Sequence, residues 1–349
     1  MKDFTKYLIS DSQSVLEALK QLNQLPFYLT LFVHDENGKM VGTLTDGDIR
    51  RGLINGNKVE DNVKSFMSAN FYYFTKDNIT VQYIKKIRDK QIKLVPFIDD
   101  FGKIIRVYDF TKRRTVLPVD AVLMAGGRGE RLRPLTDTIP KPMLTVGNKP
   151  IIEHNIDNLM LHGIDNYFVT VNYLAEQIID YFGNGGKKEI NLHCIKETKP
   201  LGTIGSVSLI TNFYNDTILI MNSDLFTNIN YEDFYLNFIK ENADMAVASI
   251  PYNVSVPYAI LNLSNDTISS FEEKPTYTYY ANAGIYLIKR ELLKSIPINE
   301  HYNTTDLIQA LLDNGKKVIK YPIIGYWIDI GKYEDYNKAQ EFAKHLSVI

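Results

Sequence analysis

The segment 123–143 carries the residues of this chain best suited to handling phosphate. An apolar run, 119–124, leads into three glycines within four positions, Gly126, Gly127 and Gly129. Glycines let a backbone approach a ligand closely and turn its N–H groups inward, which is how a loop binds phosphate oxygens. Cationic side chains that neutralise a polyphosphate follow at Arg128, Arg131, Arg133 and Lys141. A tight turn with solvated arginines is the alternative, and the combination of glycines and cations favours phosphate binding.

Two carboxylates have the setting of a divalent-metal site. The apolar strand predicted over 217–221 is followed by Asp224, and Asp329 stands in a second short apolar segment, 327–331. Two carboxylates, together with phosphate oxygens and water, form a suitable Mg²⁺ site. The alternatives are that Asp224 caps a turn and that Asp329 pairs with a lysine or arginine. The six histidines show no metal-ligand spacing.

Strands and helices alternate after residue 117. Apolar periodicity predicts helices near 152–160 and 174–182, and strands over 167–171, 190–195 and 217–221. Such alternation indicates an α/β fold with a Rossmann-like, mostly parallel sheet covered by helices. Because ligands bind beyond the carboxyl ends of parallel strands, the glycine loop and the segments after 195 and 221 should meet in one crevice.

The first 115 residues repeat one α+β pattern. A helix is predicted at 14–22 with strands at 29–33 and 40–44, and a second helix at 80–87 with strands at 95–98 and 103–108. The turn glycines of the two copies, Gly38 and Gly102, lie 64 residues apart, which indicates a duplication with repeats of about 1–60 and 61–115. A short basic stretch near 112–118 precedes a second domain over 117–349.

The composition fits a globular protein of two domains. The chain has 349 residues and a formal net charge of −2, which argues against nucleic acid as a partner. No apolar run approaches the ~18–20 residues that span a bilayer, and the start lacks the apolar core of a signal peptide. Cys194 has no second cysteine to pair with, so we expect a buried thiol in a cytoplasmic protein. The 23 tyrosines and 17 phenylalanines are interpreted as scattered packing residues, and the oligomeric state stays open, a homo-oligomer included.

The segment 123–143 closely resembles the signature of the sugar-1-phosphate nucleotidyltransferases, Gly-Gly-x-Gly-x-Arg-Leu-x-Pro-Leu-Thr followed by Pro-Lys-Pro. The resemblance implies catalytic roles for Arg131 on the triphosphate, for Lys141 on the reacting phosphates and for Asp224. It also implies that Asp224 and Asp329 hold Mg²⁺. Nucleotide contacts are implied in two loops, at Ala125, Gly126, Gly127, Gly129, Glu197, Gly202 and Thr203.

Glu197 bears on the choice of base, because the family reads its base with a side chain at this position. An ionised glutamate only accepts hydrogen bonds, and the guanine edge offers two adjacent donors, N1–H and the exocyclic amine. Uracil and thymine offer one N–H between two carbonyls, which would face a carboxylate badly. Glu197 therefore favours GTP, with a surface glutamate of no role as the alternative.

The sugar phosphate is expected to meet two later motifs. The resemblance assigns sugar and phosphate contacts to Glu273 and Lys274 of a Glu-Lys-Pro motif, and to Asn282 and Gly284 of an Asn-Ala-Gly motif. A Glu-Glu-Lys cluster taken alone is usually a solvated turn. The chain departs from the family pattern at Glu130, Ser223 and Ala259, where smaller residues or glycine are usual.

The repeated N-terminal pattern resembles a pair of CBS domains, modules that often bind adenine nucleotides between them. Thr45 and Asp48 match the Ser/Thr-x-x-Asp pattern that contacts ribose, whereas the second copy has Asp109 and Lys112 at the equivalent places. The first copy therefore predicts one regulatory nucleotide site. A purely structural module, with Thr45 and Asp48 capping the following helix, is the alternative.

Together these patterns predict an enzyme that transfers a nucleoside monophosphate from an NTP, with GTP favoured, to a sugar 1-phosphate and releases pyrophosphate. The fusion of a CBS pair to this transferase resembles guanylyltransferases of nonulosonic acid pathways, which implies glucosamine 1-phosphate as the sugar. The alternatives are a mannose-1-phosphate guanylyltransferase or another NDP-hexose pyrophosphorylase. A nucleotide-sensing regulatory protein without turnover is the alternative from a different class, and the retained Arg131, Lys141, Asp224 and Asp329 argue against it.

Overall fold

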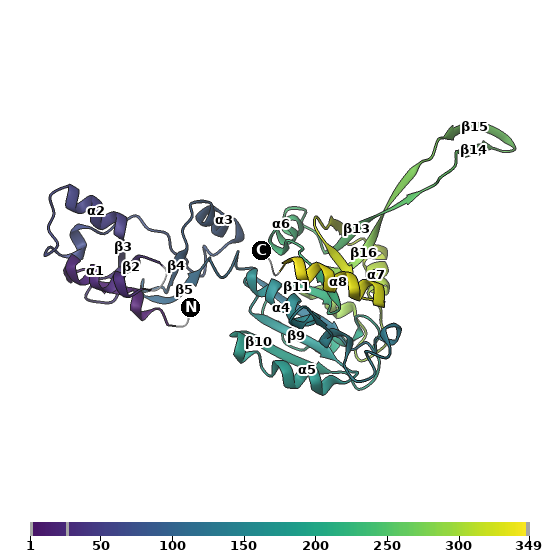
Figure 1. Cartoon of the computed structure of the whole chain (residues 1–349), viewed down its shortest axis with the longest axis horizontal. Coiled ribbons are helices and arrows are strands. Elements are labelled where there is room, and N and C mark those ends of the chain that lie inside the picture. Colours follow the sequence, from purple (N-terminus) through teal and green to yellow (C-terminus); the bar gives the residue numbers. More distant parts are fainter. Residues whose placement is uncertain (1–2, 26–27, 347–349) are drawn as a thin grey trace. The chain divides into compact units, whose positions relative to one another are not determined.

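The computed structural model describes residues 3–25 and 28–346, and the chain divides into two compact units, Met1–Val116 and Leu117–Ile349 (Figure 1). Each unit has hydrophobic cores of its own. No helix in the described part of the chain is both long and apolar enough to cross a membrane.

Unit 1 contains the two predicted copies. The first copy is built from β1 (Leu8–Ser10), α1 (Val15–Gln24), β2 (Thr30–His34), β3 (Met40–Thr45) and α2 (Asp46–Ile54). The second is built from α3 (Val81–Asp89), β4 (Leu94–Ile98) and β5 (Ile104–Asp109). The turns of the two copies meet, because the backbone N–H of Met40 donates to the carbonyl of Gly102 at 2.9 Å. The predicted helices and strands of both copies are confirmed within one or two residues.

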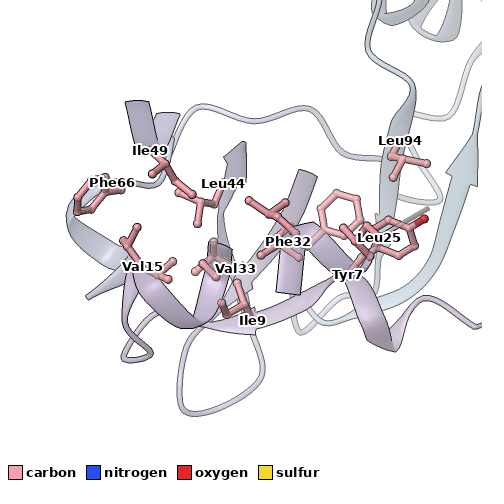
Figure 2. Close-up of a cluster of buried hydrophobic side chains, with 14 of the residues drawn as sticks. Tyr7, Ile9, Val15, Leu25, Phe32, Val33, Leu44, Ile49, Phe66 and Leu94 are labelled. Atoms are coloured by element: carbon pink, nitrogen blue, oxygen red, sulfur yellow. The ribbon is translucent and has the colours of Figure 1, made fainter. Parts of the chain in front are cut away.

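Helix α1 shows why the first copy folds as it does. Ser14 accepts a hydrogen bond from the backbone N–H of Glu17, and the Glu17 carboxylate accepts from the N–H of Ser14, which satisfies two free donors at the helix start. The helix then buries Val15, Ala18 and Leu22, which recur at intervals of three and four. Figure 2 shows Val15 among the apolar side chains of this core.

The centre of unit 2 is a seven-stranded sheet in the order β10-β9-β6-β11-β16-β13-β17. All neighbouring strands are parallel except where β16 lies antiparallel between β11 and β13. The mostly parallel sheet predicted from the sequence is therefore confirmed. The strands are β6 (Val119–Ala125), β9 (Asn166–Val171), β10 (Asn191–Lys196), β11 (Thr217–Asn222), β13 (Met245–Ser255), β16 (Thr276–Lys289) and β17 (Val318–Pro322).

Helices and short strands complete unit 2. The helices are α4 (Ile151–Leu161), α5 (Ala175–Phe182), α6 (Tyr231–Lys240), α7 (Thr304–Asp313) and α8 (Tyr333–Leu346). Three antiparallel pairs lie outside the main sheet: β7 (Thr145–Val146) with β8 (Lys149–Pro150), β12 (Leu225–Thr227) with β18 (Trp327–Asp329), and β14 (Ile260–Ser264) with β15 (Thr267–Glu272). The predictions for 167–171, 174–182, 190–195 and 217–221 match β9, α5, β10 and β11.

Strands β13 and β16 continue beyond the sheet and end in the β14–β15 hairpin. Figure 1 shows this two-stranded extension projecting from the body of unit 2. We call residues 250–281 the ribbon arm. The two hairpin strands of the ribbon arm, β14 and β15, are exposed at every residue except Ile260.

Candidate nucleotidyl-transfer site

The carboxyl ends of β6, β9, β10 and β11 open onto one cavity of about 620 Å³. The loops that follow these strands supply most of its walls, as the parallel sheet requires. The predicted residues that line it are Ala125, Gly126, Gly127, Gly129, Arg131, Lys141, Glu197, Gly202, Thr203 and Asp224.

The glycine loop is shaped by its contact with Lys141. Gly129 has a φ of 63°, in the left-handed region, and a Cβ at this position would lie 3.0 Å from Cβ of Lys141 and from Cγ2 of Thr136. Gly127 is exposed, with open space where a Cβ would stand. The loop can therefore receive a ligand on one side and holds Lys141 on the other.

Lys141 joins the two predicted metal carboxylates. Its Nζ lies 2.5 Å from Oδ2 of Asp224 and 3.8 Å from Oδ1 of Asp329, and its side chain is only 11% exposed. The aspartates come together because β12 pairs with β18 and places Leu225 opposite Asp329. Residues 105 positions apart in sequence thus face one ammonium group.

Asp224 and Asp329 are suited to a metal cation that water and phosphate oxygens bind as well. Oδ1 of Asp224 is buried without a hydrogen-bond partner in the described chain. Burial, and then the charge of Asp224, raises the pKa of Asp329. Among residues 3–25 and 28–346 no cluster of three metal-binding side chains occurs. Water and phosphate oxygens would have to complete a Mg²⁺ shell, as is usual for this ion.

Arg131 stands beside the same carboxylates. It follows Gly129 in a short 3₁₀ turn, Glu130–Leu132, and its guanidinium lies 3.4 Å from where a Cβ on Gly331 would be. Its positive charge acts to lower the pKa of Asp329, against the larger effect of burial. Exposed Glu130 also lines the cavity, so a carboxylate stands at the edge of the phosphate-binding loop.

Glu197 is buried in the cavity wall, directly after β10. It is 8% exposed, and a Cβ on Gly126 would lie 2.7 Å from its Oε1. Asn172, directly after β9, donates to its Oε2 at 3.5 Å. Burial raises the pKa of Glu197. A buried acceptor with spare lone pairs beside the glycine loop is suited to reading donors on a base.

The loop with Gly202 and Thr203 has a structural task besides lining the cavity. Gly202 has a φ of 77°, and a Cβ there would lie 2.6 Å from the carbonyl oxygen of Tyr302. The hydroxyl of Thr203 accepts a hydrogen bond from the backbone N–H of Thr304 at 2.8 Å, at the start of α7. These residues therefore fix the loop to α7, which no local sequence pattern indicates.

The two motifs predicted for the sugar phosphate are not brought together. Gly284 has a φ of 71° and packs against Asn222 at the cavity edge, and its N–H donates to the side chain of Asn282 at 2.9 Å. Glu273 and Lys274 lie on the ribbon arm, where both are exposed, and neither lines the cavity.

Sequence reasoning missed several polar residues that line the cavity: Thr170, Asn172, Ser206, Asn222 and His301. Asn172 and Asn222 stand at the ends of β9 and β11, so their places at strand ends were the available signal. Ser223, a departure from the family pattern, uses its hydroxyl to donate to the carbonyl of Met124 at 2.6 Å. Cys194 is only half-buried, so the expectation of a fully buried thiol is wrong, because β10 is the edge strand of the sheet.

Comparison with known proteins decides the family. Residues 120–345 match the family described as Nucleotidyl transferase, which is more than half of the chain. The chain belongs to the nucleotidyl transferase family. Residues 4–55 match the CBS domain, which confirms the N-terminal resemblance for the first copy, whereas the second copy stays a prediction.

Three curated relatives each match 62–64% of this nucleotidyl transferase. A UTP–glucose-1-phosphate uridylyltransferase of Synechocystis is 29% identical over 63% of the chain and 62% of its own length. The probable mannose-1-phosphate guanylyltransferase 1 of Oryza sativa is 30% identical over 62% of each chain. The bifunctional protein GlmU of Methanocaldococcus jannaschii is 31% identical over 64% of the chain and 54% of its own length. The chain thus spans less than two thirds of the relatives it matches.

Solved structures agree with the fold of unit 2. A putative glucose-1-phosphate thymidylyltransferase of Bacillus anthracis matches with a TM-score of 0.53 at 22% identity, over 65% of this chain and 95% of that chain. HddC of Yersinia pseudotuberculosis, solved with GMP-PN, matches with a TM-score of 0.51 at 25% identity, over 64% of this chain and 98% of that chain.

The candidate CBS nucleotide residues of this nucleotidyl transferase form a helix cap. Thr45 and Asp48 make a reciprocal capping box at the start of α2, in which the N–H of Thr45 donates to Asp48 at 2.9 Å. Arg51 also donates to Asp48, at 2.6 Å. The structural alternative is thus observed, and a ribose contact at the same residues remains a prediction.

Proposed function

We propose that this nucleotidyl transferase joins the nucleoside monophosphate of GTP to a sugar 1-phosphate and releases pyrophosphate. The observation that carries the proposal is the contact of Lys141, which lines the cavity together with the glycine loop, with both Asp224 and Asp329. A phosphate oxygen of the sugar 1-phosphate is already a nucleophile, so the reaction needs alignment and charge neutralisation, with no general base.

Each residue of the cavity has a task in this reaction. Asp224 and Asp329 would hold Mg²⁺, which when bound neutralises the triphosphate and orients its phosphates. The backbone of Gly126 and Gly127 receives the phosphates, and Arg131, which lines the same cavity, neutralises their charge. Lys141 holds the reacting phosphate and is itself oriented by the two carboxylates.

The preference for GTP rests on Glu197. Its buried carboxylate faces the cavity beside Gly126, where the base of a nucleotide bound to the glycine loop would lie. A carboxylate there can accept from both N1–H and the exocyclic amine of guanine. The names of the Oryza guanylyltransferase and of the HddC complex with GMP-PN are in keeping with a guanine nucleotide.

Glucosamine 1-phosphate is the sugar we propose first, from the combination of a CBS segment with this transferase. Mannose 1-phosphate is the second candidate, because several relatives carry mannose-1-phosphate guanylyltransferase in their names. Asn282 and Gly284, at the cavity edge beside Asn222, would meet the sugar.

Pyrophosphate release from the full chain with Mg²⁺, measured for four NTPs against a panel of hexose 1-phosphates, tests the proposal. We expect release with GTP and an amino-hexose or hexose 1-phosphate. Asp224→Asn should abolish it, whereas Asp216→Asn, which removes an exposed carboxylate elsewhere in unit 2, should not. Binding of nucleotides without release in any combination would favour a sensor without turnover.

We also propose that unit 1 binds a regulatory adenine nucleotide at Thr45 and Asp48. The match to the CBS domain over 4–55 supports this. Equilibrium dialysis with AMP and ATP, alongside the rate of pyrophosphate release, tests it. No binding by the wild-type chain, or binding that Asp48→Ala leaves unchanged, would contradict the assignment.

A further inference from the structure

The ribbon arm, residues 250–281, presents an apolar face that its own chain leaves uncovered. Directly opposite residues of an antiparallel pair share a face, and Tyr252 stands opposite Tyr279 and Val254 opposite Tyr277. Their exposed fractions are 61%, 60%, 39% and 37%. These four side chains form one apolar patch at the base of the arm.

The hairpin at the tip of the arm has exposed apolar side chains as well. Leu261 lies opposite Phe271, and Leu263 lies opposite Ile268. Their exposed fractions are 52%, 67%, 62% and 57%. The base and the tip of the arm therefore each present exposed apolar side chains.

The opposite face of the arm carries the Pro251–Tyr280 pair at its base and hydrogen-bonded polar pairs farther out. Thr278 donates to Asn253 at 2.9 Å, and Asn262 donates to Ser270 at 3.0 Å. Alternation of an apolar and a polar face is typical of a sheet with one side buried. Since an isolated two-stranded hairpin is marginally stable in water and exposed patches of this kind mark interaction sites, the apolar face requires a cover.

The cover must itself be apolar. The sequence 250–281 contains three acidic residues and one lysine, Lys274, so the arm does not suit an acidic surface such as nucleic acid or anionic lipid. A second copy of this chain offers a matching apolar face, which a two-fold axis would bring against the first.

The cavity also indicates that a second copy of the chain binds the arm, because residues 250–281 do not line the cavity of their own chain. Residues 276–282 are β-strand, which at about 3.3 Å per residue puts Thr276 roughly 20 Å from Asn282 at the cavity edge. Glu273 and Lys274 lie beyond Thr276. Lys274 has a φ of 47°, a left-handed conformation that a lysine uncommonly adopts, so the Glu-Lys-Pro turn has a defined shape.

We propose that two copies of this chain exchange ribbon arms. The apolar faces of the two arms cover each other, and each arm carries Glu273 and Lys274 to the sugar side of the partner's cavity. The second half of this statement rests on the proposed function, whereas the exchange itself does not.

Sedimentation velocity of the full chain tests the association. We expect a dimer at micromolar concentration, and a monomer for Leu261→Ser/Phe271→Ser, which removes two side chains from the apolar face. The matched control is Ile324→Ser, which removes an apolar side chain that is 86% exposed elsewhere in unit 2. A monomeric wild-type chain, or a double variant that stays dimeric, would overturn the proposal.

Mixing two inactive variants tests delivery to the partner's cavity. Asp224→Asn has an intact arm, and Lys274→Ala has intact metal carboxylates. In a two-fold dimer with free exchange of copies, the mixture should recover up to about a quarter of the wild-type rate. No recovery, from a mixture shown to contain mixed dimers, would mean that each arm serves its own cavity.

Disulfide trapping gives a readout that does not need activity. In a Cys194→Ala background, copies with Glu273→Cys are mixed with copies with Gly127→Cys, which stands at the open side of the glycine loop. A product of doubled mass is expected. A chain with both cysteines that closes only internally would overturn the exchange. Absence of pyrophosphate release by the wild-type chain would contradict the proposed function alone. The disulfide trapping would still show whether the arms are exchanged.

Discussion

At the scale of single residues, Asp329 carries a charge that costs stability. Burial, and then the charge of Asp224, raises the pKa of Asp329, so the folded state binds more protons than the unfolded state between the ordinary and the raised value. Stability contributed by this group is therefore lost as the pH rises through that interval. An ionised Asp329 beside Asp224 therefore lowers the free energy of unfolding.

We accordingly predict opposite effects of Asp329→Asn on stability and on activity. Above the interval the variant should melt at the same temperature as the wild-type chain or at a higher one. Its rate of pyrophosphate release should fall about 100- to 1,000-fold, as when an electrostatic group at a reaction centre is removed. Thermal unfolding across a pH series, without Mg²⁺, checks the first part. A melting temperature clearly lowered at neutral pH would contradict the account.

Glu197 gives a second prediction at this scale. Only the ionised carboxylate can accept from both donors of guanine, and burial raises the pKa of Glu197. The KM for GTP should therefore rise as the pH falls through the raised pKa. In Glu197→Gln the KM should lose this pH dependence, and kcat/KM for GTP should fall about 10- to 100-fold, the worth of a charge-assisted hydrogen bond. An unchanged preference for GTP over ATP and UTP would remove Glu197 from base recognition.

At the scale of elements, Thr203 connects the cavity wall to α7. Its hydroxyl accepts from the N–H of Thr304 and so satisfies a donor that helix geometry leaves free. Thr203→Val keeps the shape and removes the acceptor, so we predict a loss of about 1 kcal/mol in the free energy of unfolding. Urea unfolding measures this loss. A KM for GTP raised tenfold without a loss of stability would show that the hydroxyl serves the nucleotide instead.

The sequence predicted the site residues best where they follow a strand that is itself predicted. The glycine loop, Asp224 and Glu197 all follow predicted strands, and parallel strands bring such positions to one edge. The contact between Gly202 and Tyr302 joins residues 100 positions apart, and no spacing in the sequence indicates it. The family resemblance implied that Asp224 and Asp329 lie together, but the pairing of β12 with β18 that brings them together was not predicted.

The aromatic residues, interpreted from the sequence as scattered core and surface packing, are grouped on one face of the ribbon arm. Tyr252, Tyr277 and Tyr279 alternate with polar residues in the manner of strands, yet the structure exposes them together. Alternation indicates a strand with one apolar face, but it does not tell whether the cover comes from the same chain. For that reason the sequence alone did not indicate the arm.

At the scale of the whole molecule, the two units have separate cores and should respond to different ligands. Calorimetry should therefore show two unfolding transitions. GTP with Mg²⁺ at about 100 times its Kd should stabilise the transition of unit 2 by roughly 2.7 kcal/mol, and should shift that of unit 1 only by the coupling free energy that regulation requires. An adenine nucleotide should act on unit 1 instead. A single transition shifted by both ligands would contradict independent units.

Strand β16 runs without a break from the arm into the main sheet, with its residues 283–288 buried. The strand therefore links the arm directly to Asn282 and Gly284, although its pairing with β13 shifts register between Asn282 and Tyr286. Binding of the arm by a second copy would therefore act on Asn282 and Gly284, the residues proposed to meet the sugar. If two copies exchange arms as proposed, the reaction rate per molecule should fall on dilution, because a single copy would lack Glu273 and Lys274 of its partner.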